Sequence, residues 1–112
     1  MKSSDKILCA IYGLIAVGAL FATWSQNLAF FALPDNGGLA GFIRMSYANP
    51  AAASITNDIV FVCFAIFAFM LVEARRLGMK HVWLYIVLSC CIAISVMLPL
   101  FLLARQRKLA LA

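Results

Sequence analysis

Long apolar runs separated by short polar segments dominate the pattern of the chain. The first run starts at Ile7, and it contains no charged residue over the 18 positions to Trp24 and remains largely apolar to Phe31. This length is close to the roughly 20 residues that an α-helix needs to cross the hydrocarbon core of a bilayer. The basic residues before it resemble the start of a signal peptide, but the run continues past any small-x-small cleavage site. The pattern therefore predicts a retained transmembrane helix over 7–31.

The second run follows a clear helix-start signal, Asn49-Pro50. Asn favours the N-cap, and Pro suits the first helical position, where its missing N–H would have no partner. A helix over 50–76 would be about 40 Å long, which exceeds the hydrocarbon thickness. We therefore place the charge-free part, 59–72, in the bilayer. The turns before it lie in the headgroup layer or pack on the preceding loop.

The segment between these two helices leaves the membrane at the turn-forming residues of 34–38. Residues 39–47 are too few and too polar to cross a bilayer. As a helix they place Leu39, Phe42, Ile43 and Met45 on one broad apolar side, which is typical of a short helix lying at the membrane interface. A lid folded back over the helices is the alternative.

A charged hinge, 73–81, precedes the third run, which extends from Val82 to Ala104 without a charge. The hinge predicts a tight loop at a membrane surface, and the run predicts a third span, bent by Pro99 near Ser95. The expected fold is thus a single all-α domain over 1–112. It is an integral membrane three-helix bundle with spans at 7–31, 50–76 and 82–104 and an interfacial helix at 39–47.

Composition supports this class. The chain is 66% hydrophobic and 12% charged, whereas soluble domains are roughly 45–50% apolar and 25% charged. The net charge of +5 comes from basic residues at the ends of the apolar runs, where they meet lipid headgroups, so nucleic-acid binding is not expected. The four cysteines have no metal-site spacing and are expected to pack as small apolar side chains, and no metal site is predicted.

The distribution of Lys and Arg gives little information on orientation if the chain has three spans. Five of these residues would lie on the side of the N-terminus and the hinge, and four on the side of the C-terminus. Because the first span often dominates, we expect a multi-pass protein of the cytoplasmic membrane with its N-terminus in the cytoplasm.

The chain contains a series of short motifs: Asn27 with Phe30-Phe31, Phe42-Ile43, Ala48-Asn49-Pro50-Ala51, Asp58, 73–79, Trp83 with Tyr85, and 99–102 with Arg105. Together they resemble the bacterial domain-of-unknown-function family 2834. The resemblance covers nearly the whole chain and implies a small, three-span bacterial membrane protein, without an agreed activity. The tail departs from the family pattern, which has Arg-Glu-Arg where this chain has Arg105-Gln106-Arg107, so a tail ion pair through that carboxylate is not expected.

Candidate chemistry depends on which ends of the spans meet. In a three-span bundle, Asn27, Asp58, Arg44 and Arg105 share one membrane face. Ionisable groups within spans are costly and usually pair, so we expect Asp58 to pair with Arg105 or Arg44, with Asn27 bridging. This polar cluster either ties the helices together or forms the floor of a site for a headgroup or small ligand.

At the opposite face, Glu73 is expected to bridge to Arg76 one turn later, and Arg75, Arg76 and Lys80 are candidates for holding an anionic lipid headgroup. Three aromatic residues are expected to anchor the spans at the interfaces, namely Trp24, Trp83 and Tyr85.

Two functions from different classes fit this pattern. The first is a structural or accessory subunit, in a homo-oligomer or a larger membrane complex, with membrane lipids as its surroundings and without enzymatic activity. The second is a binding protein or small enzyme for a lipophilic ligand, such as an isoprenoid, carotenoid or quinone, although no cofactor is predicted outright. A multidrug-type transporter ranks last because the spans lack a deep carboxylate. The absence of a histidine pair and of a Lys within a span disfavours haem and retinal.

Overall fold

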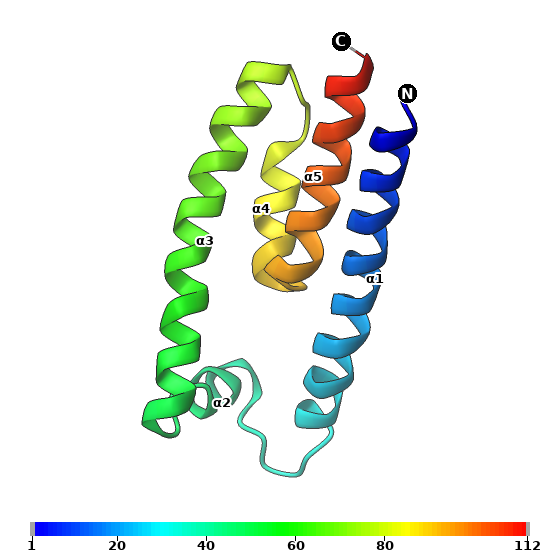
Figure 1. Cartoon of the computed structure of the whole chain (residues 1–112). Helices are drawn as coiled ribbons and strands as arrows, with labels where there is room; N and C mark the ends of the chain where they lie inside the picture. The colour runs from blue at the N-terminus through cyan, green and yellow to red at the C-terminus, as the bar shows by residue number, and fades with distance from the viewer. Residues whose placement is uncertain (1, 112) are drawn as a thin grey trace.

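The computed structural model describes residues 2–111, which form five α-helices and no strand (Figure 1). The expected all-α class is therefore confirmed for this part of the chain. The helices are α1 (Ser3–Phe31), α2 (Gly38–Met45), α3 (Pro50–Leu77), α4 (Val82–Cys91) and α5 (Ile94–Leu111).

The ends of α3 follow the signals in the sequence. The Asn49 side chain accepts a hydrogen bond from the backbone N–H of Ala52 at 2.8 Å, and Pro50 occupies the first helical position. At the other end Gly78 adopts φ +68°, and the next N–H, that of Met79, donates to the Ala74 carbonyl at 2.8 Å. A left-handed residue after a helix is most easily supplied by glycine, so α3 ends at Leu77, inside the predicted hinge 73–81, and only 78–81 form a loop.

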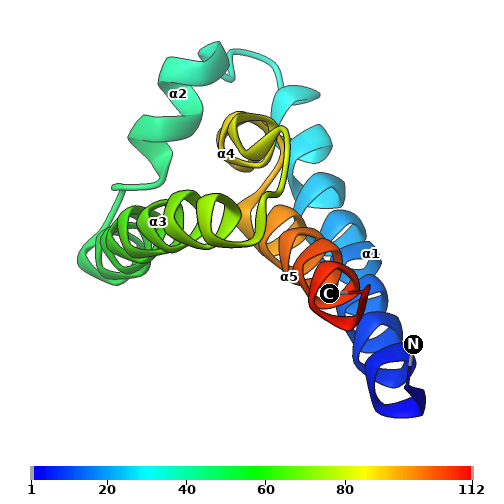
Figure 2. The ribbon, with the colours of Figure 1, turned by 90° about the horizontal axis from the view of Figure 1, so that it is seen from above.

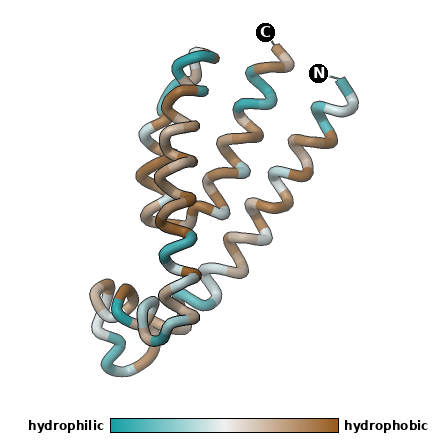
Figure 3. The backbone as a smooth tube through the Cα atoms, turned by 60° about the vertical axis from the view of Figure 1, so that its left-hand side comes forward, coloured by the Kyte–Doolittle hydropathy of each residue, from teal (hydrophilic) through white to brown (hydrophobic). Residues whose placement is uncertain are grey.

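Helices α1 and α3 are each long and apolar enough to span a membrane. Only 6% of the most apolar window of either helix is buried, whereas an equally apolar helix in the core of a soluble protein would be mostly buried. Hydrophobic residues dominate the middle of the molecule, and hydrophilic ones gather near its two ends (Figure 3). This distribution is the one expected for helices that cross a hydrocarbon layer.

The predicted third span is not a single helix. It divides at Ile92 and Ala93 into α4 and α5, which run in opposite directions as a helical hairpin (Figure 1). With 10 residues, α4 is about 15 Å long, roughly half the thickness of a hydrocarbon core. The expected three-helix bundle is therefore not confirmed, and both termini lie at the same end of the molecule rather than on opposite sides.

The division of this segment is stabilised by contacts with other helices. At the tip of the hairpin, the indole N–H of Trp24 in α1 donates to the Ile92 carbonyl at 3.0 Å, which gives a partner to a group that the helix break would leave free. The reversal also turns two faces of α5 toward different neighbours. Val96 and Met97 pack with Ala16 of α1, and Phe101 packs with two residues of α3, Met70 and Ala74.

Seen from the end that holds the termini, α5 lies along α1, and α3 stands on the other side of the hairpin (Figure 2). We call this end, with residues 2–6, 70–81 and 101–108, the basic end. The opposite end, residues 27–64, we call the α2 end. Within the described residues, α3 has no buried side chain before Met70. The packed core thus occupies only the part of the molecule that the hairpin reaches.

At the α2 end, α2 joins α1 through aromatic contacts. The Phe42 ring lies 5.3 and 5.7 Å, centroid to centroid, from the rings of Phe30 and Phe31. Leu39, Ile43 and Met45 remain exposed. An apolar face that is free on a surface helix fits the expected position at a membrane interface better than a lid over the core.

Candidate functional site

The most strongly paired polar group in the described residues is the carboxylate of Glu73, near the end of α3. It accepts a hydrogen bond from Nε of Arg76 on one oxygen and from Nε of Arg105 on the other, each at 2.6 Å. The side chains of Glu73, Arg105 and Arg76 are 8%, 25% and 60% exposed. The pair with Arg105 is thus the better shielded of the two, and it joins α3 to α5 across 32 positions of the chain.

Aromatic rings complete this contact. The guanidinium of Arg105 lies 5.8 Å from the centroid of the Phe69 ring, which meets Phe101 edge-on, and Tyr85 of α4 meets Phe101 in the same way. A guanidinium over an aromatic face gains electrostatic attraction from the ring. Three helices therefore converge on the Glu73–Arg105 pair, which fixes the arm of the hairpin that returns to the basic end.

The structure does not assemble the polar cluster expected from the sequence. Arg105 pairs with Glu73 at the basic end, whereas Asn27, Arg44 and Asp58 belong to the α2 end. Asp58 and Arg44 are exposed, and neither forms an ion pair within residues 2–111. The pairing of Asp58 with Arg105 is wrong because the hairpin reverses the chain, so the end of α5 returns to the side from which α4 began.

The sequence contained part of the observed arrangement. The Glu73–Arg76 bridge was expected from the spacing of one helical turn and is confirmed. The partner on α5 was missed, because a continuous helix from 82 would have carried Arg105 to the far side of the bilayer. A signal was nevertheless present, since Glu73 directly follows a charge-free run and would need a second partner when shielded there.

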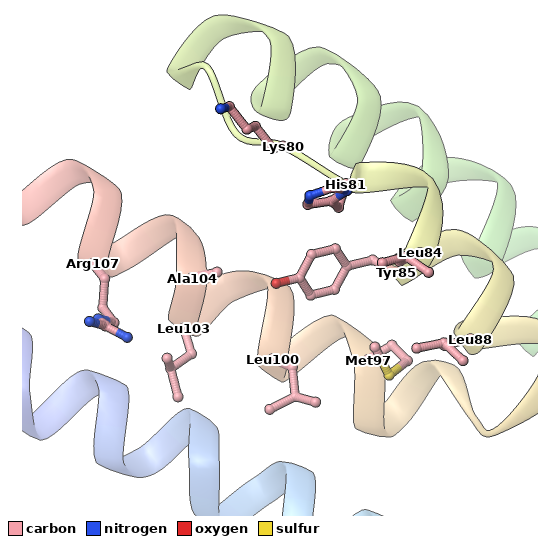
Figure 4. Close-up of a pocket in the computed structure, with 10 residues that line it drawn as sticks. All are labelled: Lys80, His81, Leu84, Tyr85, Leu88, Met97, Leu100, Leu103, Ala104 and Arg107. Atoms are coloured by element: carbon pink, nitrogen blue, oxygen red, sulfur yellow. The ribbon is translucent and has the colours of Figure 1, made fainter.

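A second feature of the basic end is a groove between the hinge, α4 and α5, with a volume of about 560 Å³ (Figure 4). Its rim carries three basic residues, Lys80 and His81 from the hinge and Arg107 from α5. None of these takes part in an ion pair among the described residues, and no carboxylate lines the groove. The Tyr85 ring projects into it with the hydroxyl directed toward α5. The walls are otherwise apolar: Leu84, Leu88, Met97, Leu100, Leu103 and Ala104.

The predicted headgroup residues are divided between different surroundings. Arg76 is held by Glu73, Arg75 is exposed on the surface of α3, and Lys80 lies at the rim of the groove. They share the basic end, as expected from the sequence, but they do not line one cavity.

The predicted aromatic anchors also differ from one another. Trp83, in the first turn of α4, is exposed as a membrane anchor would be. Trp24 instead uses its N–H inside the fold, at the tip of the hairpin, and Tyr85 faces the groove. These two positions follow from the hairpin, which the sequence pattern did not predict.

The polar tail is tied to α1. Gln106 donates its amide N–H to the Asp5 carboxylate at 2.6 Å, an interaction that a glutamate at this position could not make while ionised. A thiol contact from Cys9 to the Leu103 carbonyl, at 3.9 Å, lies about one turn deeper along the same pair of helices. The described residues contain no group of three His, Cys, Asp or Glu side chains placed to hold a metal ion.

A protein-family model covers most of the chain. The family model described as "Protein of unknown function DUF2834" matches residues 11–107, from the first helix to the rim of the groove. The chain belongs to this family. The description of the family states no activity, and searches of curated proteins and of solved structures give no match to the chain.

Proposed function

We propose that the chain is an integral membrane protein in which α1 and α3 cross the bilayer and the α4–α5 hairpin enters from the basic end and returns to it. The apolar, exposed surfaces of α1 and α3 support the two crossings. The length of α4 and the reversal at Ile92 support a hairpin that reaches only part of the way. Backbone at that depth must find hydrogen-bond partners within the protein, as the Ile92 carbonyl does.

The arrangement of charge supports one orientation. Of the nine Lys and Arg residues, eight lie at the basic end, and only Arg44 lies at the α2 end. In a three-span fold the same residues would have been divided five to four. Because cytoplasmic segments carry the excess of Lys and Arg, we place both termini and the hinge in the cytoplasm of a bacterial inner membrane, with α2 on the outer side.

Within that membrane we propose a structural or accessory role, as a subunit of a homo-oligomer or a larger membrane complex. One observation carries this proposal: along the α2 end, α3 extends for about five turns without a buried side chain, and α1 packs mainly against α5. Large side chains remain exposed there, including Phe61 and Phe64. In bilayers helices associate through close packing, so an additional helix at this surface would complete the half of the molecule that the hairpin leaves open.

A mild extraction with a tag on the full chain tests this role. We expect the protein to require detergent for extraction and to elute with more than one copy or with another membrane protein. Substituting Phe61 and Phe64 by Ala should release the partner without unfolding the chain. Elution as a monomer with no other protein would contradict the subunit role, and extraction without detergent would contradict the membrane placement.

Binding of a lipophilic ligand is the second candidate, and the groove at the basic end is the observation that favours it. The sequence placed a ligand site among the phenylalanines with Asp58 at its polar end, but Asp58 forms no ion pair within residues 2–111. The groove instead combines apolar walls with basic side chains that form no ion pair in the same residues. No side chain at the groove is arranged as a nucleophile with a base, which favours binding over catalysis.

A further inference from the structure

We propose that the groove between the hinge, α4 and α5 binds one anionic phospholipid, with its phosphate at the rim and part of an acyl chain along the apolar walls. The inference rests on the membrane placement proposed above and is independent of the subunit role. A volume of about 560 Å³ lies within the range of about 300–1,000 Å³ found for small-molecule pockets.

The rim has the charge that a phosphodiester requires. Lys80 and His81 line the groove from the hinge and Arg107 lines it from α5, so the lining takes its basic residues from two elements that are distant in sequence (Figure 4). Both ion pairs among the described residues use Glu73, so the cations at the rim are free to bind an external anion. Guanidinium and ammonium groups are the usual protein partners of phosphate.

Tyr85 provides the transition between the polar rim and the apolar walls. Its hydroxyl donates no hydrogen bond to any group in residues 2–111, although the ring is half-buried and packs edge-on against Phe101. A phenol at this place can donate to a phosphate or ester oxygen. Below it, Leu84, Leu88 and Leu100 offer the kind of surface that a lipid tail covers.

The position of the groove determines which source of phosphate it meets. It opens at the basic end, where the inner leaflet has its anionic headgroups and where Lys and Arg are attracted to them. An apolar wall below a cationic rim matches an amphiphile, because its tail covers the wall, whereas a free phosphate would contact the rim alone. The choice of a lipid, in place of a soluble phosphate compound, follows from this combination.

Other basic residues at the same end provide a matched control. Arg75 carries the same charge at the same membrane face, but it is exposed on α3 and does not line the groove. Arg107→Gln and Lys80→Gln are therefore expected to weaken binding about fivefold each, and Arg75→Gln to leave it unchanged, if the rim and not the general charge of the surface holds the lipid.

Native mass spectrometry of the full-length protein, released from micelles containing phosphatidylglycerol and phosphatidylcholine with identical chains, tests the proposal. We expect one phosphatidylglycerol to be retained in preference to phosphatidylcholine. Ala104→Phe, which fills the apolar part and keeps every charge, should abolish this retention, and inorganic phosphate should not displace the lipid. The melting temperature of each variant in detergent shows whether it remains folded.

Three results would overturn the proposal. Equal retention of the two lipids would exclude recognition of the phosphatidylglycerol headgroup. An equal loss with Arg75→Gln would show a diffuse surface effect, and displacement by inorganic phosphate would show an anion site without a lipid. These results leave the subunit role intact, whereas recovery of the chain without detergent would contradict the membrane placement itself.

Discussion

The two ends of the molecule differ in how they are held together. At the basic end, three helices meet around Phe101, and the Glu73 carboxylate joins α3 to α5. At the α2 end, three phenylalanine rings join α1 to α2, and two side-chain hydrogen bonds join the residues after α2 to α3, from Tyr47 to Asn57 and from Thr56 to the Ser46 carbonyl. The difference shows that packing inside this chain depends on how far the hairpin reaches, since the few buried residues of α1 and α3 lie where these helices meet the hairpin.

The difference between the two ends is tested most directly by determining on which side of the membrane the hairpin ends. After replacement of the four native cysteines, single cysteines at Ser3, Asp35 and Lys108 should react with a membrane-impermeant maleimide in vesicles of known orientation. We expect the probes at 3 and 108 to react from the same side and the probe at 35 from the other, an all-or-none difference. If the probe at 108 follows the probe at 35, the third segment crosses the membrane and the hairpin is wrong.

The next largest effect is expected from removing core volume at the basic end. Phe101 is fully buried and Phe61, at the α2 end, is 71% exposed. Phe101→Ala should lower the free energy of unfolding by about 3 kcal/mol, and Phe61→Ala should change it by less than about 0.5 kcal/mol. Unfolding of each monomeric variant in mixed micelles with increasing dodecyl sulfate measures both values. Similar losses for the two variants would mean that the ends are equally packed.

Removing the charge of Glu73 should have a smaller effect that is specific to α5. Glu73→Gln leaves the Arg105 guanidinium partly shielded without its carboxylate, so the unfolding midpoint should fall, whereas Arg75→Gln should leave it unchanged. In the double variant with Arg105→Gln, the two losses should not add, because both remove the same interaction. Additive losses would show that the two side chains act separately.

A still smaller loss is expected at the tip of the hairpin. Trp24→Phe keeps a large ring but removes the donor to the Ile92 carbonyl, which should cost about 1 kcal/mol. The matched change Trp83→Phe, at an exposed ring without a hydrogen bond among the described residues, should cost nearly nothing in the same micelle assay. Hydrogen exchange at 92–95 should also rise in Trp24→Phe alone. If neither the free energy of unfolding nor the hydrogen exchange at 92–95 changes, the indole hydrogen bond does not stabilise the tip.

The smallest effect on the isolated chain is expected at the α2 end, for Asp58→Asn. The side chain is exposed and has no ion-pair partner within residues 2–111, so the unfolding midpoint should stay the same. An effect confined to co-purification of a partner would place Asp58 at an intermolecular contact. A large fall in the unfolding midpoint of the monomer would instead support the internal polar cluster that the sequence suggested.

Local signals in the sequence determined α1, α2 and the start and end of α3. Each has its own cause: an uninterrupted apolar run, the turn residues of 34–38, the Asn49-Pro50 cap and the left-handed Gly78. These causes act within a few residues, so the pattern was sufficient. The Glu73–Arg76 bridge was predictable for the same reason.

Only the tertiary structure decided the form of 82–104 and everything that depends on it. This run is apolar on every side, so periodicity contains no information about where it turns, and no glycine or proline marks Ile92 and Ala93. The turn exists because Trp24 provides a hydrogen bond there, and because Val96 and Phe101 find neighbours on two different helices. The partner of Arg105, the common side of the termini and the groove all follow from that reversal, and a long-range contact of this kind cannot be read from local pattern.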